Sequence, residues 1–283
     1  MTPFIKMHGT GNDYVFLDCF RHPIPDQPHE LARRMSDRRF AVGSDGLIFI
    51  CPSSRADAKM RMFNADGSEA EMCGNGIRCV AKYLFEHGIC DQKKMSIETG
   101  NGVLDVELEV AGGAVGQIRV DMGEPILDPA AIPAKLPSEN GGPVIAVPMI
   151  VAGRSFQATC VSMGNPHCVV FVEHADDEWV LEWGPRIERD PHFPHGVNVE
   201  FVEVQSEQEL RQRTWERGTG ETWACGTGAC AACVAGVLTG RTQREVVVQL
   251  RGGQLHLEWS KNDNHLYMSG PAAEVFTGDF NAQ

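Results

Sequence analysis

The chain has 283 residues, of which 42% are hydrophobic and 22% are charged, and its formal net charge is −13. This length exceeds the size at which one hydrophobic core usually stops growing, so we expect two domains. The negative charge argues against nucleic acid or an anionic membrane as a partner, because nothing would neutralise their phosphates. Residues 1–8 lack the apolar stretch of a signal peptide, so we expect a cytoplasmic location.

In the first half, short apolar or alternating runs bounded by Gly, Asn or Asp predict strands. They cover residues 13–19, 46–51, 58–64, 94–99, 103–110 and 116–122. A short helix is predicted near 28–38, after Pro28, and a principal helix over about 75–88. Prolines and glycines then concentrate over 118–145, which predicts the domain boundary there.

In the second half, strands are predicted at 154–162, 167–172, 197–204, 208–216, 244–251, 253–259 and 264–269. The principal helix of this half covers about 227–239 and lies within an uncharged run from Thr222 to Gly240. A helix that is apolar on all sides is normally enclosed, so we expect this one to be buried rather than to span a membrane.

Many strands around one enclosed helix predict an α+β fold in which a barrel-like sheet wraps a central helix. We expect one such lobe from residues 1–118, joined by a last strand at about 272–283, and another from residues 119–271.

An internal repeat relates the two halves. The segment Met72–Cys79 (MCGNGIRC) resembles Ala224–Cys230 (ACGTGAC), and their leading cysteines, Cys73 and Cys225, lie 152 residues apart. Asn12 and Asn165 share their surroundings at an offset of 153, as do Asp45 and Asn198. The recurring offset indicates a duplicated domain rather than a chance match.

Each cysteine of this repeat directly precedes a predicted helix and is followed by Gly. Unpaired backbone N–H groups and the positive end of the helix dipole meet at such a position. We therefore expect a lowered thiol pKa and a thiolate that acts as a base. The N–H groups of Gly74 and Asn75, and of Gly226 and Thr227, should bind a carboxylate.

Two such elements in a duplicated fold predict a two-base mechanism. Pseudo-twofold symmetry would place the thiols of Cys73 and Cys225 facing one another across an interdomain cleft. One thiolate would remove a proton from a carbon and the other thiol would return one to the opposite face. This exchange inverts a stereocentre without a cofactor.

Seven short elements of the chain resemble those of the diaminopimelate epimerase family, and the resemblance runs from residue 6 to the Gly270-Pro271 region. The motifs that carry the resemblance are KMHGTGND (6–13), FNADGSE (63–69), MCGNGIRC (72–79), GNPH (164–167), NVE (198–200), ERG (216–218) and GETWACGTG (220–228). The resemblance implies conversion of LL-2,6-diaminopimelate to the meso form, in lysine and peptidoglycan precursor synthesis. It also implies two similar lobes, a cytoplasmic homodimer, and no pyridoxal phosphate or metal.

The resemblance assigns roles to individual residues. Cys73 and Cys225 would be the acid/base pair, and His167 and Glu216 would tune their protonation. Substrate binding would fall to Asn12, Asn64, Gly74, Asn75, Asn165, Asn198, Glu216, Arg217, Gly226 and Thr227. Many members carry a substrate-contacting glutamine where this chain has Gly46.

The two halves differ where Asn64-Ala65 aligns with Glu216-Arg217. A second, distal carboxylate on the substrate needs its own cation, and a guanidinium binds carboxylate through two hydrogen bonds. We therefore expect Arg217 to anchor that group.

Three alternatives remain open at this stage. The chain could be a racemase of another amino acid, as the related proline and hydroxyproline enzymes are, although a small cyclic substrate has no distal carboxylate for Arg217. It could instead be a thiol redox or zinc-binding protein that uses Cys73, Cys79, Cys225, Cys230 and Cys233. Asn12, Asn165 and Asn198 could also be turn residues that satisfy local backbone groups.

Overall fold

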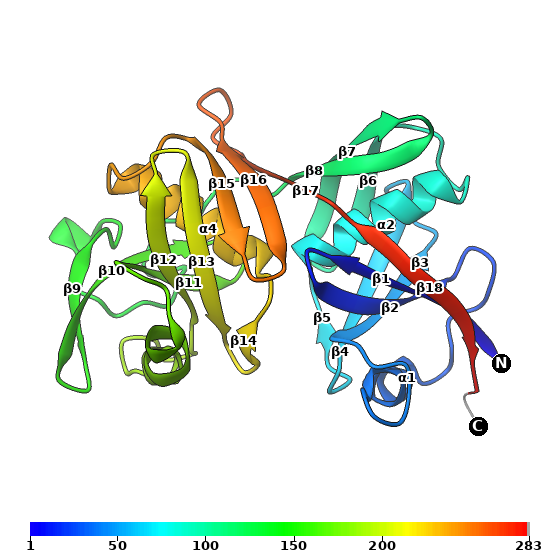
Figure 1. Cartoon of the computed structure of the whole chain (residues 1–283), viewed down its shortest axis with the longest axis horizontal. Helices are drawn as coiled ribbons and strands as arrows, with labels where there is room; N and C mark the ends of the chain where they lie inside the picture. The colour runs from blue at the N-terminus through cyan, green and yellow to red at the C-terminus, as the bar shows by residue number, and fades with distance from the viewer. Residues whose placement is uncertain (282–283) are drawn as a thin grey trace. The chain divides into compact units, whose positions relative to one another are not determined.

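The computed structural model describes residues 1–281 and divides into two compact units. The first unit contains residues 1–121 and the segment from Ser269 onward, and the second contains Met122–Met268. In Figure 1 the first unit is coloured blue to green, with a red last strand, and the second green to orange. No helix among the described residues is long and apolar enough to cross a membrane.

The described part of the first unit is built from nine strands and two helices. They are β1 (Thr2–Gly9), β2 (Asn12–Asp18), α1 (Pro28–Ser36), β3 (Gly46–Cys51), β4 (Ala58–Asn64), β5 (Glu69–Ala70), α2 (Gly74–Glu86), β6 (Lys94–Thr99), β7 (Gly102–Ala111), β8 (Ala114–Asp121) and β18 (Ala273–Phe280), with the end of β17 (Leu266–Gly270) leading in from the second unit.

The second unit follows a similar plan. It contains η1 (Glu139–Gly141), β9 (Val147–Val151), β10 (Arg154–Ser162), β11 (Pro166–Val172), η2 (Glu178–Trp183), α3 (Gly184–Glu188), β12 (Asn198–Ser206), β13 (Glu209–Glu216), β14 (Gly220–Thr222), α4 (Gly226–Leu238), β15 (Glu245–Leu250) and β16 (Gly253–Trp259).

Strand pairing confirms the duplication. In the first unit β1–β2 is antiparallel, β2–β3 parallel, β3–β4 antiparallel and β4–β6 parallel. In the second unit β10–β11, β11–β12, β12–β13 and β13–β15 repeat this order of antiparallel and parallel pairs. The N-terminus of α2 in the first unit and that of α4 in the second therefore occupy equivalent positions in the repeated fold.

Each sheet wraps one central helix, as predicted. Helix α2 packs against β1, β2, β6, β7 and β8, and α4 packs against β10 to β13, β15 and β16. Residues 226–236 of α4 are all buried, which fits their lack of charge. The predicted ranges of both helices are correct to within two residues.

The opposite face of each sheet is also covered, so several strands are buried on both sides. In the first unit Leu31 and Met35 of α1 pack on Leu17 and Phe63. In the second unit the η2–α3 segment, including Trp183, covers the corresponding face. Burial on both faces explains why all six residues of β3 are buried and the strand forms a continuous apolar run.

The sequence patterns predict no element over 2–9, 147–151 or 178–188, and this was wrong. β1 contains Pro3 and Lys6, which interrupt its apolar pattern, yet it is held between β2 and β18. The η2–α3 segment contains Gly184-Pro185, a pair typical of a turn, but proline is tolerated in the first turn of a helix.

Candidate active site

Each repeat cysteine is the N-cap residue of its central helix, as predicted. Cys73 has an extended backbone (φ −143°, ψ 114°), and its Sγ accepts a hydrogen bond from the Gly76 N–H at 3.3 Å. Cys225 (φ −108°, ψ 106°) accepts the equivalent bond from Gly228, also at 3.3 Å. The thiols thus take the place that Ser or Asp normally occupies at a helix start.

The glycines that bind the thiols are required by close packing. A Cβ on Gly228 would lie 2.7 Å from Glu200 Oε1 and 3.1 Å from Cys225 Sγ. A Cβ on Gly76 would lie 2.6 Å from Ile48 Cδ1. Either side chain would displace the neighbours that define the cysteine's surroundings.

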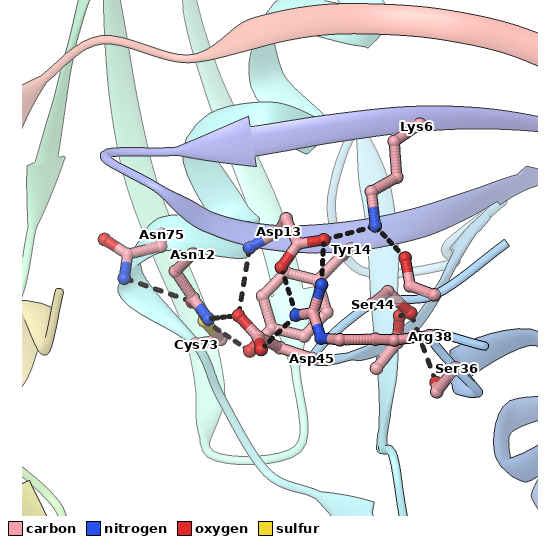
Figure 2. Close-up of polar contacts among 12 residues, drawn as sticks. Lys6, Asn12, Asp13, Tyr14, Ser36, Arg38, Ser44, Asp45, Cys73 and Asn75 are labelled. Atoms are coloured by element: carbon pink, nitrogen blue, oxygen red, sulfur yellow. Dashed lines mark hydrogen bonds and ion pairs between the residues drawn. The ribbon is translucent and has the colours of Figure 1, made fainter. Parts of the chain in front are cut away.

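Around Cys73, polar groups come from β2 and α2 (Figure 2). Sγ lies 3.6 Å from Asn12 Oδ1 and 3.5 Å from Tyr14 Oη. The same Asn12 oxygen accepts a hydrogen bond from Asn75 Nδ2 at 3.1 Å. Asn12, Asn75 and Cys73, which were predicted from the sequence, are therefore brought together, and Tyr14 was not predicted.

Asn64 and Gly46 occupy paired positions on β4 and β3. Asn64 Nδ2 donates to Ser68 Oγ at 3.0 Å, so this side chain belongs to the turn after β4 and contacts no other residue of the Cys73 group. A Cβ on Gly46 would lie 2.2 Å from the Phe63 carbonyl oxygen. The close approach of the Phe63 backbone therefore leaves no room for a side chain at position 46.

Around Cys225, the main feature is a buried histidine–glutamate pair. His167 Nδ1 lies 2.8 Å from Glu200 Oε1, and both side chains are fully buried. His167 Nε2 lies 3.0 Å from Asn165 Oδ1. Cys225 Sγ also contacts Thr227 Oγ1 at 3.6 Å.

The expectation that the helix N-terminus lowers the thiol pKa is wrong for Cys225. Burial raises the pKa of this thiol well above its ordinary value, and the negative charges of Glu216 and Glu200 add to the effect. The hydrogen bonds from Thr227 and Gly228 act in the opposite direction but are weaker. Cys225 is therefore a thiol at neutral pH and is suited to donate a proton.

Asn198 and Arg217 lie together at the start of β12 and the end of β13. Asn198 Oδ1 accepts from the Arg217 N–H at 2.9 Å, and its Nδ2 donates to the Pro166 carbonyl at 3.0 Å. The Arg217 guanidinium is exposed and donates to the His195 carbonyl at 3.2 Å, and it forms no ion pair with any acidic residue within 1–281. This cation is available to an external carboxylate.

The β13–β14 turn that carries Arg217 is braced by two carboxylates. Glu216 Oε1 accepts from Thr222 Oγ1 at 2.5 Å. Glu188 of α3 accepts from Gly218 N and from Trp215 Nε1, both at 2.8 Å. Glu188 was not predicted, and nothing in its sequence surroundings singles it out.

Three further residues of these groups, Asp45, Tyr14 and Glu200, were not predicted as site residues. Asp45 aligns with Asn198 at the repeat offset, which was a usable signal. Tyr14 follows the 6–13 motif directly, and Glu200 ends the NVE motif. Tyr14 lies on the same face of β2 as Asn12, and Glu200 on the same face of β12 as Asn198, because alternate strand residues share a face.

Within residues 1–281, Cys225 is the one cysteine of the proposed zinc or redox set that lies in a group of three potential metal ligands. Cys79, Cys230 and Cys233 are fully buried in the central helices. Burial raises the pKa of Cys79 and of Cys233 to about 12, so both remain thiols. The one group of potential ligands in residues 1–281 is His167, Glu200 and Cys225, whose ligand atoms lie within 4.8 Å of one another.

Solved structures of low sequence identity share the duplicated fold of this chain. A probable proline racemase from Agrobacterium radiobacter shares the fold with a TM-score of 0.73 and 15% identity, covering 100% of this chain and 94% of that one. A hydroxyproline epimerase from Agrobacterium vitis matches with a TM-score of 0.70 and 15% identity, over 98% and 90% of the two chains.

Sequence comparison identifies the family to which the chain belongs. The family model described as diaminopimelate epimerase matches residues 4–127 and 159–275. Diaminopimelate epimerases from Moorella thermoacetica and Leptospira biflexa are 52% and 50% identical, each over 98% of this chain and 98% of its own length. The chain belongs to the diaminopimelate epimerase family and is an isomerase of the amino-acid epimerase type.

Proposed function

We propose that the chain interconverts LL- and meso-2,6-diaminopimelate, with Cys73 and Cys225 as the two acid/base groups. The observation that carries the proposal is the repeated cysteine N-cap, with Sγ in each unit 3.3 Å from the N–H of the third residue of its helix. The family membership and the relatives named as diaminopimelate epimerases support the choice of substrate.

In the proposed reaction, the thiolate of one cysteine removes the α-proton and becomes a thiol. The thiol of the other cysteine gives its proton to the opposite face of the carbanion and becomes a thiolate. Charge and protons balance, and the next turnover starts from the reverse protonation state. The raised pKa of Cys225 suits it to the donor role in the resting enzyme.

The binding groups divide by their chemistry. The α-carboxylate would lie at the helix N-termini, against the N–H groups of Gly74, Asn75, Gly226 and Thr227, where the dipole favours an anion. Each well-placed donor would stabilise developing enolate charge by roughly 3 kcal/mol. The exposed guanidinium of Arg217 would bind the distal carboxylate. The remaining polar contacts are proposed for Asn12, Asn64, Asn165, Asn198 and Glu216, with His167 and Glu216 tuning Cys225.

The test is to follow LL-diaminopimelate in heavy water by proton NMR. The two-base mechanism predicts that deuterium enters one α-position of the meso product at once, while remaining LL substrate initially keeps its proton. Cys73→Ala and Cys225→Ala should each abolish turnover, whereas Cys90→Ala, which changes a half-buried thiol outside both groups, should retain it. Full activity in either active-site variant would refute the proposal.

Two controls address the alternatives. Racemisation of L-proline at a comparable rate would move the chain to the proline racemase type. Stoichiometric zinc in the purified active enzyme would favour the metal-binding alternative.

A cytoplasmic homodimer is also part of the proposal, since biosynthetic relatives suggest that setting. Light scattering of the purified chain should give twice the monomer mass.

A further inference from the structure

A cluster of charged side chains lies directly behind Asn12, and Figure 2 shows its members. Arg38 Nη2 lies 2.6 Å from Asp13 Oδ1 and 2.8 Å from Asp45 Oδ1, so one guanidinium joins two carboxylates. Lys6 pairs with Asp13 from the other side and donates to the Gly43 carbonyl. We name Lys6, Asp13, Arg38 and Asp45 the Asp45 cluster.

Asp45 is the member that reaches Asn12. Its Oδ2 accepts a hydrogen bond from Asn12 Nδ2 at 2.6 Å and another from the Asp13 N–H at 3.1 Å. Its backbone is also fixed, because its N–H donates to the Asp13 carbonyl and its carbonyl accepts from Ala65. The carboxylate is therefore held at the start of β2, next to the residue that contacts Cys73.

A carboxylate accepts hydrogen bonds but does not donate them, and this determines the orientation of the Asn12 amide. With Nδ2 bound to Asp45, the amide oxygen must point away from Asp45, toward Cys73 Sγ at 3.6 Å and Asn75 Nδ2 at 3.1 Å. The opposite orientation would place the Asn12 oxygen against the Asp45 carboxylate and two N–H₂ groups against each other.

We propose that Asp45, held by Arg38, is a positioning residue that keeps the Asn12 amide oxygen directed at the Cys73 thiol. This inference rests on the proposed acid/base role of Cys73. An oxygen at this position accepts from the S–H group and stabilises the thiol, whereas an N–H₂ group there would donate to sulfur and stabilise the thiolate. Asp45 thereby sets the protonation preference of Cys73 through Asn12.

The second unit supports this assignment by contrast. The position equivalent to Asp45 is Asn198, a neutral residue that binds the Pro166 carbonyl and the Arg217 N–H instead. The position equivalent to Asn12 is Asn165, whose oxygen faces His167. The charge at Asp45 is thus a feature of the Cys73 side, since the equivalent residue of the second unit is neutral.

Other groups around Cys73 and Asn12 in this unit have to be considered in any pH experiment. β1 contributes Lys6, β2 contributes Asp13 and Tyr14, the segment after α1 contributes Arg38, and α2 contributes Cys79. Lys6 and Arg38 both pair with Asp13, so the cluster keeps its two cations when Asp45 is replaced.

The test compares Asp45→Asn with a matched control, Asp57→Asn. Asp45→Asn keeps size and shape but allows Asn12 to turn over. Asp57 is also an exposed carboxylate of the first unit that accepts a backbone N–H, from Ser96 at 2.7 Å, but it precedes β4 at the end remote from Asn64. Two readouts are needed: kcat/KM for diaminopimelate, and the pH profile of Cys73 alkylation by iodoacetamide, resolved by peptide mass spectrometry.

For Asp45→Asn we expect kcat/KM to fall at least about tenfold and the midpoint of Cys73 alkylation to fall by about one pH unit. The alkylation midpoint of the Cys225 peptide should not move, and Asp57→Asn should behave as the unchanged chain in every readout. An unaltered Cys73 midpoint in folded Asp45→Asn would overturn the inference, even if activity falls. Asp45→Glu should restore part of the activity, and no recovery would also count against it.

These experiments distinguish a failure of the Asp45 inference from a failure of the proposed function. Activity retained in Cys73→Ala would reject the role of Cys73 itself. A normal loss of activity in Cys73→Ala, combined with an unshifted alkylation profile in Asp45→Asn, would reject only the role of Asp45.

Discussion

At the scale of single residues, the Cys225 side depends on a carboxylate with no contact to solvent. Glu200 holds His167 at 2.8 Å, contributes to the raised pKa of Cys225, and has one oxygen, Oε2, with no hydrogen-bond partner among the described residues. A buried carboxylate is costly unless it is paired, and the contact with His167 Nδ1 both pairs Glu200 and orients the imidazole.

We expect Glu200→Gln to lower the pKa of Cys225, because one of the negative charges that raise it is removed. The thiolate fraction at a fixed pH then increases, so alkylation of the Cys225 peptide by iodoacetamide should be faster by about tenfold. Turnover should fall, because Gln no longer accepts a charge-assisted bond from His167. An unchanged Cys225 alkylation rate would show that Glu200 does not influence this thiol. Glu203→Gln, at a half-buried carboxylate on the same strand, is the control.

The proposed anchor for the distal carboxylate gives a second prediction at this scale. Arg217→Lys keeps the charge but loses the planar two-donor geometry, so binding of diaminopimelate should weaken by about 1–2 kcal/mol, a rise in KM of roughly five- to thirtyfold. The rate at saturation should change less, because the reacting centre is untouched. Equal affinity in steady-state kinetics would remove Arg217 from this role. Arg211→Lys, on the same strand and also exposed, should leave KM unchanged.

At the scale of elements, the start of α4 is packed too tightly for any side chain at Gly228. We expect Gly228→Ala to displace Glu200 or the Cys225 sulfur, since both lie within 3.1 Å of the added carbon. Such displacement should lower kcat about a hundredfold and the free energy of unfolding by about 1–3 kcal/mol. Gly116→Ala in β8 is the matched control, because its added carbon would meet nothing closer than 3.8 Å. Wild-type kcat in Gly228→Ala would contradict the close packing.

The central helices and most strands could be predicted because their signals are local. The Cys-Gly start and the uncharged run defined α4, and alternation defined strands such as β4 and β7. The η2–α3 segment could not be predicted, because its helical turns depend on Val180 and Trp183 packing against the sheet of the second unit. The raised pKa of Cys225 was also beyond the sequence, since it results from burial and from Glu200, a strand residue distant along the chain.

At the scale of the whole chain, the two units differ in the strand that completes one side of the sheet. In the second unit β9 pairs with β10, and the chain passes directly from one to the other. In the first unit the equivalent strand, β1, pairs with β18, which comes from the end of the chain. In the second unit the neighbouring strand is thus the other arm of a local hairpin, whereas in the first unit the first strand of the chain pairs with the last. No local pattern specifies its register with β1, although the sequence predicted both the strand and its place in the first lobe.

Removal of residues 273–283 should therefore destabilise the first unit selectively. Seven residue pairs join β18 to β1, Phe276 lies edge-on against Phe4 with ring centroids 6.0 Å apart, and Phe280 packs against the core under α1. Their loss should cost on the order of 5 kcal/mol and leave β1 as an unprotected edge. Hydrogen exchange followed by mass spectrometry should show faster exchange in β1 and β2, whereas β9 and β10 keep their protection because their ladder is intact. A chain that lacks only residues 282–283 retains every β1–β18 pair and serves as the control. Equal acceleration in both units would mean that β18 stabilises the chain as a whole rather than the unit whose sheet it completes.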